Sequence, residues 1–279
     1  MSEKIDKIGK WSEDKLDLLK KYLEAYANIM KDQTWCKGVY YIDAFAGTGK
    51  PKAKDEERFI DGSPIRALTI KYPFSKYFFI EKSSWRINKL GSLKEKFSNL
   101  KIEIIKGDCN KLLLKFIPNL SYNSYRRALV FLDPFGMSLD WNVIEQLAST
   151  KTIEIFLNLP LMAMNRVCLM NNPDKLTKEK IDQMNKLWGS EEWQHLTYSE
   201  LPTLFGNKQK IKNDIDAKKI SDSFVKRLKS IFSYVSSPLI MRNSNNGPLY
   251  CLIFAGHNEK GKNIIEDIFG RFEKFKNSK

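Results

Sequence analysis

Residues that could build a metal site or a disulfide framework are scarce in this sequence. Its 279 residues include two histidines, His195 and His257, and neither has a cysteine or the other histidine nearby. Zinc sites and disulfide-rich domains need closely spaced ligands, or an extracellular setting. The sequence therefore predicts no metal centre, no disulfide framework and no catalytic triad built on histidine. Four cysteines lie far apart and form no CxxC pair: Cys36, Cys109, Cys168 and Cys251.

A long apolar run is also missing. No stretch reaches the roughly 18 residues that a membrane-spanning helix needs. Residues 1–10 are polar and lack the apolar centre of a signal peptide. The sequence therefore predicts a cytoplasmic protein with no membrane association.

Acidic residues are outnumbered by basic ones. The chain has 47 Lys and Arg against 33 Asp and Glu, which gives a formal net charge of +14. A basic surface attracts phosphate backbones, so the balance favours a nucleic-acid partner, either RNA or DNA. The excess is spread along the chain rather than clustered, and a lysine-rich, AT-rich genome would produce the same excess. Charge alone therefore leaves both explanations open.

Short apolar strands alternate with helical segments over the first 160 residues. This alternation predicts a parallel sheet with helices on both faces. The strands are expected at 40–42, 77–80, 102–105, 128–132 and 152–157, with helices over 11–31, 63–70, 85–97, 112–116 and 141–148.

The pattern breaks after residue 160 and returns near residue 216. We interpret 161–215 as a helical insertion, or cap, over the edge of a pocket. Two later strands, 235–241 and 249–255, are joined through Asn245-Asn246-Gly247, which is typical of a hairpin. The predicted fold is α/β: a Rossmann-like, doubly wound, mostly parallel sheet with an antiparallel terminal hairpin. The core then comprises 1–160 and 216–279, interrupted by the insertion at 161–215.

The first strand runs directly into a glycine-rich turn, Asp43-Ala44-Phe45-Ala46-Gly47-Thr48-Gly49. Glycine permits positive φ and lets a ligand approach the backbone closely. In doubly wound folds the ligand binds at the carboxyl ends of the strands. The turn is therefore predicted to form the floor of a pocket, although Gly-x-Gly also occurs in ordinary tight turns.

Four of the predicted parallel strands are followed by an acidic residue. Carboxylates gathered at one edge would repel one another unless a ligand separates or engages them, so the coincidence indicates a binding function. The four residues are Asp43, Glu81, Asp108 and Asp133.

This arrangement resembles S-adenosylmethionine-dependent methyltransferases of class I. In that fold an acid and a glycine turn after the first strand face the methionine part of the cofactor. An acid after the second strand binds the ribose hydroxyls, and an acid after the third reads the adenine amine. A nicotinamide site fits less well, because the turn is not GxGxxG and Glu81 lies beyond the usual spacing of about 20 residues. The matching positions are Asp43, Phe45, Ala46, Gly47, Gly49, Glu81, Asp108 and Cys109.

The sequence Asp133-Pro134-Phe135-Gly136 stands where methyltransferases of exocyclic amines carry Asp/Asn-Pro-Pro-aromatic. The resemblance implies that the Asp133 carboxylate and the Pro134 carbonyl accept hydrogen bonds from an amine, while Phe135 stacks on the base. The variant is similar to that of tRNA guanine-N2 dimethyltransferases. The second proline and the final aromatic residue are missing, so the target base is open. A strand end with a turn and no catalytic role is the alternative.

Across nearly the full chain, the order of motifs resembles the bacterial three-Cys-motif partner family (TcmP). The resemblance implies a methyltransferase-like fold and a cysteine-rich protein partner. At the end of the fifth strand Asn158 could reach the substrate or only cap a helix, and Asn165 and Arg166 could face a phosphate. The motifs are 43–49, Asp61-Gly-Ser-Pro64, Phe79-Ile-Glu81, Gly107-Asp-Cys109, 133–136 and Asn158-Leu-Pro-Leu-Met-Ala-Met-Asn165.

Three functions follow as hypotheses. The first is a methyltransferase that uses S-adenosyl-L-methionine and acts on an exocyclic amine of a nucleobase in RNA or DNA. The second is a partner or adaptor protein that binds the cofactor, or a related nucleotide, with little or no catalysis. The third is a nucleic-acid-binding protein with an empty Rossmann-like pocket.

Overall fold

The protein is described here from a computed structural model of the chain. It describes residues 6–278 apart from 169, 171–175 and 203–207.

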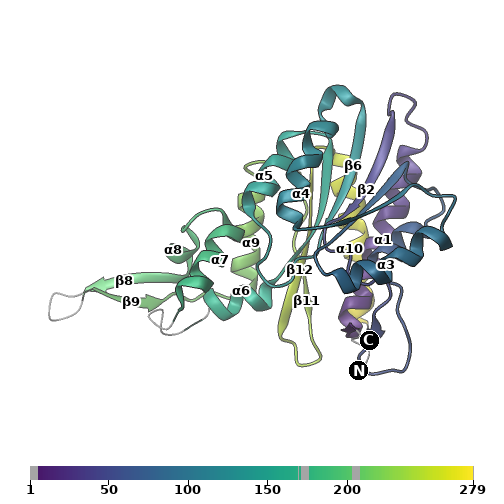
Figure 1. Ribbon diagram of the computed structural model, residues 1–279. Coiled ribbons are helices and arrows are strands. Elements are labelled where there is room, and N and C mark those ends of the chain that lie inside the picture. The colour runs from purple at the N-terminus through teal and green to yellow at the C-terminus, as the bar shows by residue number, and fades with distance from the viewer. Residues whose placement is uncertain (1–5, 169, 171–175, 203–207, 279) are drawn as a thin grey trace.

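An eight-stranded sheet forms the centre of the molecule (Figure 1). Along it the order is β5 (Ile102–Lys106), β4 (Lys76–Glu81), β2 (Gly38–Asp43), β6 (Arg126–Leu132), β7 (Ile153–Leu159) and β12 (Pro248–Gly256). The first five strands are parallel, and β12 is antiparallel to β7. Both β10 (Tyr234–Val235) and β11 (Leu239–Arg242) pair antiparallel with β12. The predicted class I methyltransferase-like sheet with its terminal hairpin is confirmed.

Helices cover both faces of this sheet, which explains why its strands are apolar on both sides. Successive residues point to opposite faces, so Tyr41 packs with one helical layer and Ile42 with the other. One layer contains α1 (Lys10–Met30), α2 (Ser63–Leu68), α3 (Ser84–Lys96) and α10 (Glu259–Asn277). The other contains α4 (Cys109–Phe116), α5 (Trp141–Ser149), α6 (Leu161–Cys168), α7 (Lys178–Trp188), α8 (Trp193–Thr197) and α9 (Ala217–Leu228), with the short 3-10 turns η1 (Ile117–Leu120) and η2 (Tyr122–Ser124) beside it.

The stretch 161–215 is not only helical. Besides α6, α7 and α8 it contains an antiparallel hairpin of β8 (Tyr198–Pro202) and β9 (Lys208–Lys212), which projects from the body of the molecule in Figure 1. Trp188 and Trp193 are buried in the same core cluster as α9. These two tryptophans therefore hold the segment to the core. The division of the chain at 160 and 215 stays a prediction.

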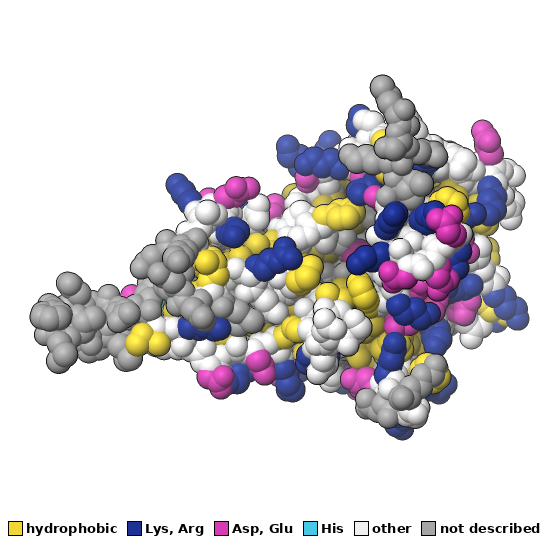
Figure 2. Space-filling model, turned by 90° about the horizontal axis from the view of Figure 1, so that it is seen from below, with side chains coloured by type: hydrophobic (Ala, Val, Ile, Leu, Met, Phe, Trp, Pro, Cys, Tyr) yellow, Lys and Arg dark blue, Asp and Glu magenta, His cyan; other side chains and the backbone are white. Residues whose placement is uncertain are grey.

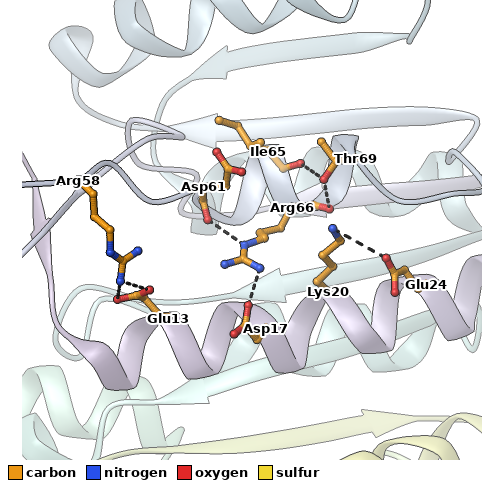
Figure 3. A network of polar contacts seen from close by, with 9 residues as sticks. All are labelled: Glu13, Asp17, Lys20, Glu24, Arg58, Asp61, Ile65, Arg66 and Thr69. Carbon is orange, nitrogen blue, oxygen red and sulfur yellow. Dashed lines mark hydrogen bonds and ion pairs between the residues drawn. The ribbon is translucent and has the colours of Figure 1, made fainter.

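The N-terminal segment and the loop after the glycine turn are fastened to each other and to α1. Strand β1 (Lys7–Ile8) pairs in parallel with β3 (Lys52–Ala53). Figure 3 shows that the Arg58 guanidinium donates to both carboxylate oxygens of Glu13, at 2.9 and 2.8 Å, while Arg66 bonds Asp17. These contacts hold residues 50–62 beside the carboxyl edge of the sheet.

No helix in the part of the chain that the structure describes is long and apolar enough to cross a membrane. Among those same residues, no group of three or more His, Cys, Asp or Glu side chains is placed to hold a metal ion. The structure does not describe the side chain of Cys168.

The carboxyl group of Glu154 lies inside the core. Glu154, on β7, accepts a hydrogen bond of 2.7 Å from the hydroxyl of Tyr22 on α1. Burial raises the pKa of Glu154 from 4.5 to about 7, although the Tyr22 hydrogen bond and Arg127 pull it down. The folded protein therefore holds a proton on this group at pH values where the unfolded chain has lost it.

We expect this group to make folding stability fall as the pH rises from about 4.5 to about 7, by about 3 kcal/mol. Glu154→Gln removes this part of the pH dependence, because an amide does not titrate. Urea unfolding at pH 5 and pH 7.5 measures the difference. Tyr22→Phe serves as the comparison: it keeps the carboxyl group, so the pH dependence should persist, and the pKa of Glu154 should rise further because the hydrogen bond that lowers it is lost. An unchanged pH dependence in Glu154→Gln would contradict the assignment.

Candidate functional site

Two adjoining pockets lie at the carboxyl edge of the parallel strands. The first, the glycine-turn pocket, has a volume of about 280 Å³ and is lined by residues 6–8, Lys15, 45–49, Ser63 and 133–135, among others. The second, the Glu81 pocket, has a volume of about 180 Å³ and is lined by Glu81, 107–109, Ser138 and their neighbours. Phe45 and Phe135 line both. Figure 2 views the molecule from this end and shows acidic side chains lying among basic ones.

The glycine turn leaves its backbone open to a ligand. Gly47 has φ of 64° and Gly49 has φ of 74°, so both need the left-handed region that glycine adopts easily. A Cβ on Gly47 would meet no atom within 4 Å, whereas one on Gly49 would press on Leu90 and Leu93. The space above Gly47 is therefore open, whereas Gly49 allows the turn to pack closely on α3.

Asp43 supports this turn from within the protein. Its side chain is fully buried, and it accepts hydrogen bonds from the backbone N–H of Phe45 at 3.2 Å and from the Tyr41 hydroxyl at 3.4 Å. Burial raises the pKa of Asp43 to about 7, with hydrogen bonds from Ser63 and Phe45 opposing the rise. The structure thus places Asp43 behind the turn and not among the residues that line either pocket.

Glu81 joins the second strand to the glycine turn. Its Oε2 accepts from the Gly47 N–H at 3.1 Å, and its Oε1 accepts from the Ser83 N–H at 2.8 Å. Arg86, at the start of α3, has Nη1 3.8 Å from Glu81 Oε2. The same guanidinium donates to both oxygens of Asp6 at 3.0 Å and lies 4.6 Å from the centre of the Phe135 ring. Arg86 therefore ties the N-terminal segment to residues of both pockets.

Asp108 has a structural role that the sequence pattern alone could not distinguish from a role in binding. It is the N-cap of α4, and its Oδ1 accepts from the backbone N–H of Asn110 at 3.0 Å. Its Oδ2 lies 3.7 Å from Lys82 Nζ. Burial raises the pKa of the adjacent Cys109 thiol to about 12, which disfavours the thiolate form near neutral pH. Both residues line the Glu81 pocket, and their assignment to an adenine site stays a prediction.

Asp133 is engaged by two side chains from distant parts of the chain. Lys15 Nζ bonds its Oδ2, and Asn158 Nδ2 donates to its Oδ1. Lys15 is almost completely buried, whereas the Asp133 side chain is about a quarter exposed, at 26%. The other amide atom, Asn158 Oδ1, is buried and has no hydrogen-bond partner among the described residues. Phe135, beside them, is 59% exposed.

The described residues of 161–215 do not line either pocket, so the expected cap over the pocket is not seen there. Arg166 is exposed on α6, and Asn165 Oδ1 is buried without a partner among the residues described. The structure therefore brings Asn158 to Asp133 but leaves Arg166 apart from the pockets.

Three contributors were not predicted from the sequence: Lys15, Arg86 and the segment 6–8. The sequence pattern could have indicated Lys15, because it lies at the same helical spacing as the buried residues of α1. These residues are Leu18, Leu19 and Tyr22. A lysine at such a position needs an acidic partner. Nothing local marks Arg86, whose partner Asp6 is 80 residues away.

No family model matches the chain, and no curated protein matches it. Among solved structures, LPL1258 of Legionella pneumophila is 13% identical, with 90% of each chain covered and a TM-score of 0.49. The provisionally assigned methyltransferase yhhF from Escherichia coli is 15% identical over 50% of this chain and 67% of its own, with a TM-score of 0.32. The N-terminal domain of EvdMO1, with SAH bound, is 9% identical over 85% of this chain and 81% of its own, with a TM-score of 0.40. Similarities this slight carry no functional argument, and the fold assignment rests on the strand order itself.

Proposed function

We propose that this protein is a methyltransferase that uses S-adenosyl-L-methionine and acts on an exocyclic amine of a nucleobase in RNA or DNA. The observation that carries the proposal is the junction of the two pockets. The glycine turn and Asp133 line one pocket, Glu81 lines the other, and Phe45 and Phe135 line both. A nucleoside cofactor and an amine would meet there.

The residues present fit the cofactor. Together the two cavities reach the range of about 300–1,000 Å³ that is usual for small-molecule sites. Each Glu81 oxygen holds one backbone N–H and keeps a second lone pair for a ribose hydroxyl. Asp108 and Cys109 would hold the adenine, and the open backbone at Ala46, Gly47 and Gly49 would face the methionine part. When bound, the cofactor supplies a methyl group on a sulfonium.

The chain's own groups at Asp133 suit an amine. The Asp133 carboxylate and the Pro134 carbonyl are acceptors, and both residues line the glycine-turn pocket. Hydrogen bonds to these atoms would orient the nitrogen lone pair, and Phe135 offers an exposed ring on which a base can stack. Orientation supplies much of the rate in such a direct transfer. The proton that the amine loses can pass to the Asp133 carboxylate or to water.

A second candidate function is cofactor binding without transfer, in a protein that serves a partner. Lys15 and Asn158 already occupy one position on each Asp133 oxygen, which favours this candidate. A cysteine-rich partner of the three-Cys-motif type stays a prediction for either candidate.

Glu81→Gln should weaken binding of S-adenosylmethionine, and of its demethylated product, by about 10- to 100-fold, because it replaces a charged acceptor of ribose hydroxyls. Isothermal titration calorimetry measures the change. Glu95→Gln, at an exposed position of α3, is the matched control and should bind like the unmodified protein. Equal affinity in both variants would argue against a ribose site at Glu81.

Asp133→Ala should reduce methyl transfer to nucleic acid at least about 100-fold, while cofactor affinity changes little. Transfer of a labelled methyl group to total RNA and to DNA measures the rate. Asp182→Ala, on the exposed face of α7, controls for loss of an acid. Retained turnover in Asp133→Ala would show that Asp133 is not part of the catalytic site. Cofactor binding without any transfer by the unmodified protein would favour the second candidate.

The Lys15–Asp133 ion pair should couple the two residues energetically. A double-mutant cycle on unfolding stability, with Lys15→Met and Asp133→Asn, should give a coupling energy of about 1–3 kcal/mol, because Lys15 is buried. The exposed Lys218–Asp222 pair on α9, with Nζ and Oδ2 2.9 Å apart, is the control and should couple more weakly. Coupling no larger than in the control would mean that Lys15 does not hold Asp133.

A further inference from the structure

Exposed aromatic side chains gather at the amino edge of the sheet, opposite both pockets. They come from the loop after α1 and from the turn before β6, which lie together at the upper end of the sheet in Figure 1. The backbone N–H of Lys37 donates to the Tyr125 carbonyl at 2.8 Å and joins the two loops. The exposed fractions are 45% for Trp35, 62% for Tyr122 and 49% for Tyr125.

Cations lie over these rings. The Arg127 guanidinium is 4.5 Å from the centre of the Trp35 ring and 5.3 Å from that of Tyr122. Lys37 Nζ lies 5.2 Å from the centre of the Tyr125 ring. Each ring therefore has a cation beside it and a large part of its surface in contact with solvent.

A groove of about 190 Å³ continues from this cluster. Lys31, Cys36 and Lys37 line it, and Lys31 Nζ lies 4.3 Å from the centre of the Tyr72 ring. Two acids interact with these cations: the exposed Asp32 carboxylate is 3.8 Å from Lys31 Nζ, and the buried Glu154 interacts electrostatically with Arg127. Two of the cations that line the groove, Lys31 and Lys37, therefore each lie beside an aromatic ring.

Tyr125 adopts a conformation that its side chain disfavours. Its φ is 54°, in the left-handed region that bulky residues rarely occupy. Since about half of the side chain is exposed, burial does not explain why a tyrosine stands there. Strain at an exposed aromatic residue is a sign of function.

We propose that this amino-edge surface binds single-stranded nucleic acid, with bases stacked on Trp35, Tyr122 and Tyr125 and phosphates beside Lys31, Lys37 and Arg127. Exposed rings interleaved with cations are the features that single-strand-binding proteins combine. A duplex keeps its bases stacked on one another and leaves the rings without a partner. The inference rests on the proposed function in one respect: the strand that binds here is taken to be the methylation substrate. Binding at this surface does not involve the cofactor pockets, which lie about 17 Å away along β2.

Fluorescence anisotropy tests the proposal with labelled 20-nucleotide strands of mixed sequence and no cofactor. The strands are RNA, DNA and an abasic DNA of equal length, each at 50 and 200 mM salt. We expect the base-bearing strands to bind about tenfold or more tightly than the abasic strand. Parallel RNA and DNA measurements identify which chemistry the surface prefers.

The double variant Trp35→Ala/Tyr122→Ala should lower affinity for base-bearing strands at least about tenfold and remove their advantage over the abasic strand. Phe275→Ala, at an aromatic residue that is 55% exposed on α10, is the control. Tyr125→Asn should bind more weakly yet unfold at the same or a higher temperature, because asparagine tolerates the left-handed region. This variant separates binding from folding.

Three outcomes would overturn the proposal. One is unchanged affinity in the Trp35/Tyr122 variant. Another is equal binding of the abasic strand, which would show attraction to any polyanion. The third is equally effective competition by polyglutamate, which would indicate an acidic protein as the partner. If binding follows the proposal but no methyl transfer is found, the surface assignment stands and the methyltransferase proposal fails.

Discussion

Every carboxylate brought to the carboxyl edge of this sheet needs a hydrogen-bond donor or a cation, and the site is built around that requirement. The sequence suggested that a ligand would have to separate the four acids. The structure shows that the protein compensates each of them itself: Asp43 is held inside by backbone and hydroxyl donors, and Asp108 caps α4. Glu81 takes two backbone N–H groups, and Asp133 takes Lys15 and Asn158. Mutual repulsion is therefore no evidence for a ligand here.

The evidence for a ligand lies instead in what these partners leave open. At Glu81 the donors are backbone groups of Gly47 and Ser83, which fix the carboxylate without filling both lone pairs of either oxygen. At Gly47 the space above the Cα is empty, although the turn beneath it is tightly packed. A rigid carboxylate next to an open backbone would offer the proposed cofactor a preorganised site, because little reordering would accompany binding.

Features that depend on neighbouring residues could be predicted from the sequence, and features that join distant segments could not. The apolar runs that become β2, β4, β5, β6 and β7, and the acids after them, follow from local pattern and from the geometry of a parallel sheet. The Lys15–Asp133 pair spans 118 residues and the Arg86–Asp6 pair spans 80. No periodicity encodes such contacts. The hairpin β8–β9 was missed because its short strands are polar and resemble a loop.

The positive charge that was ambiguous in the sequence becomes interpretable once its neighbours are known. Some surface lysines and arginines simply pair with an acid one helical turn away, as Lys218 does with Asp222 and Arg271 with Asp267. A lysine-rich genome would produce such solvated pairs anywhere on the surface. Arg127 and Lys37 differ, since each lies over an exposed ring. The proposed nucleic-acid surface is therefore marked by cations placed beside exposed aromatic side chains, and not by the net charge.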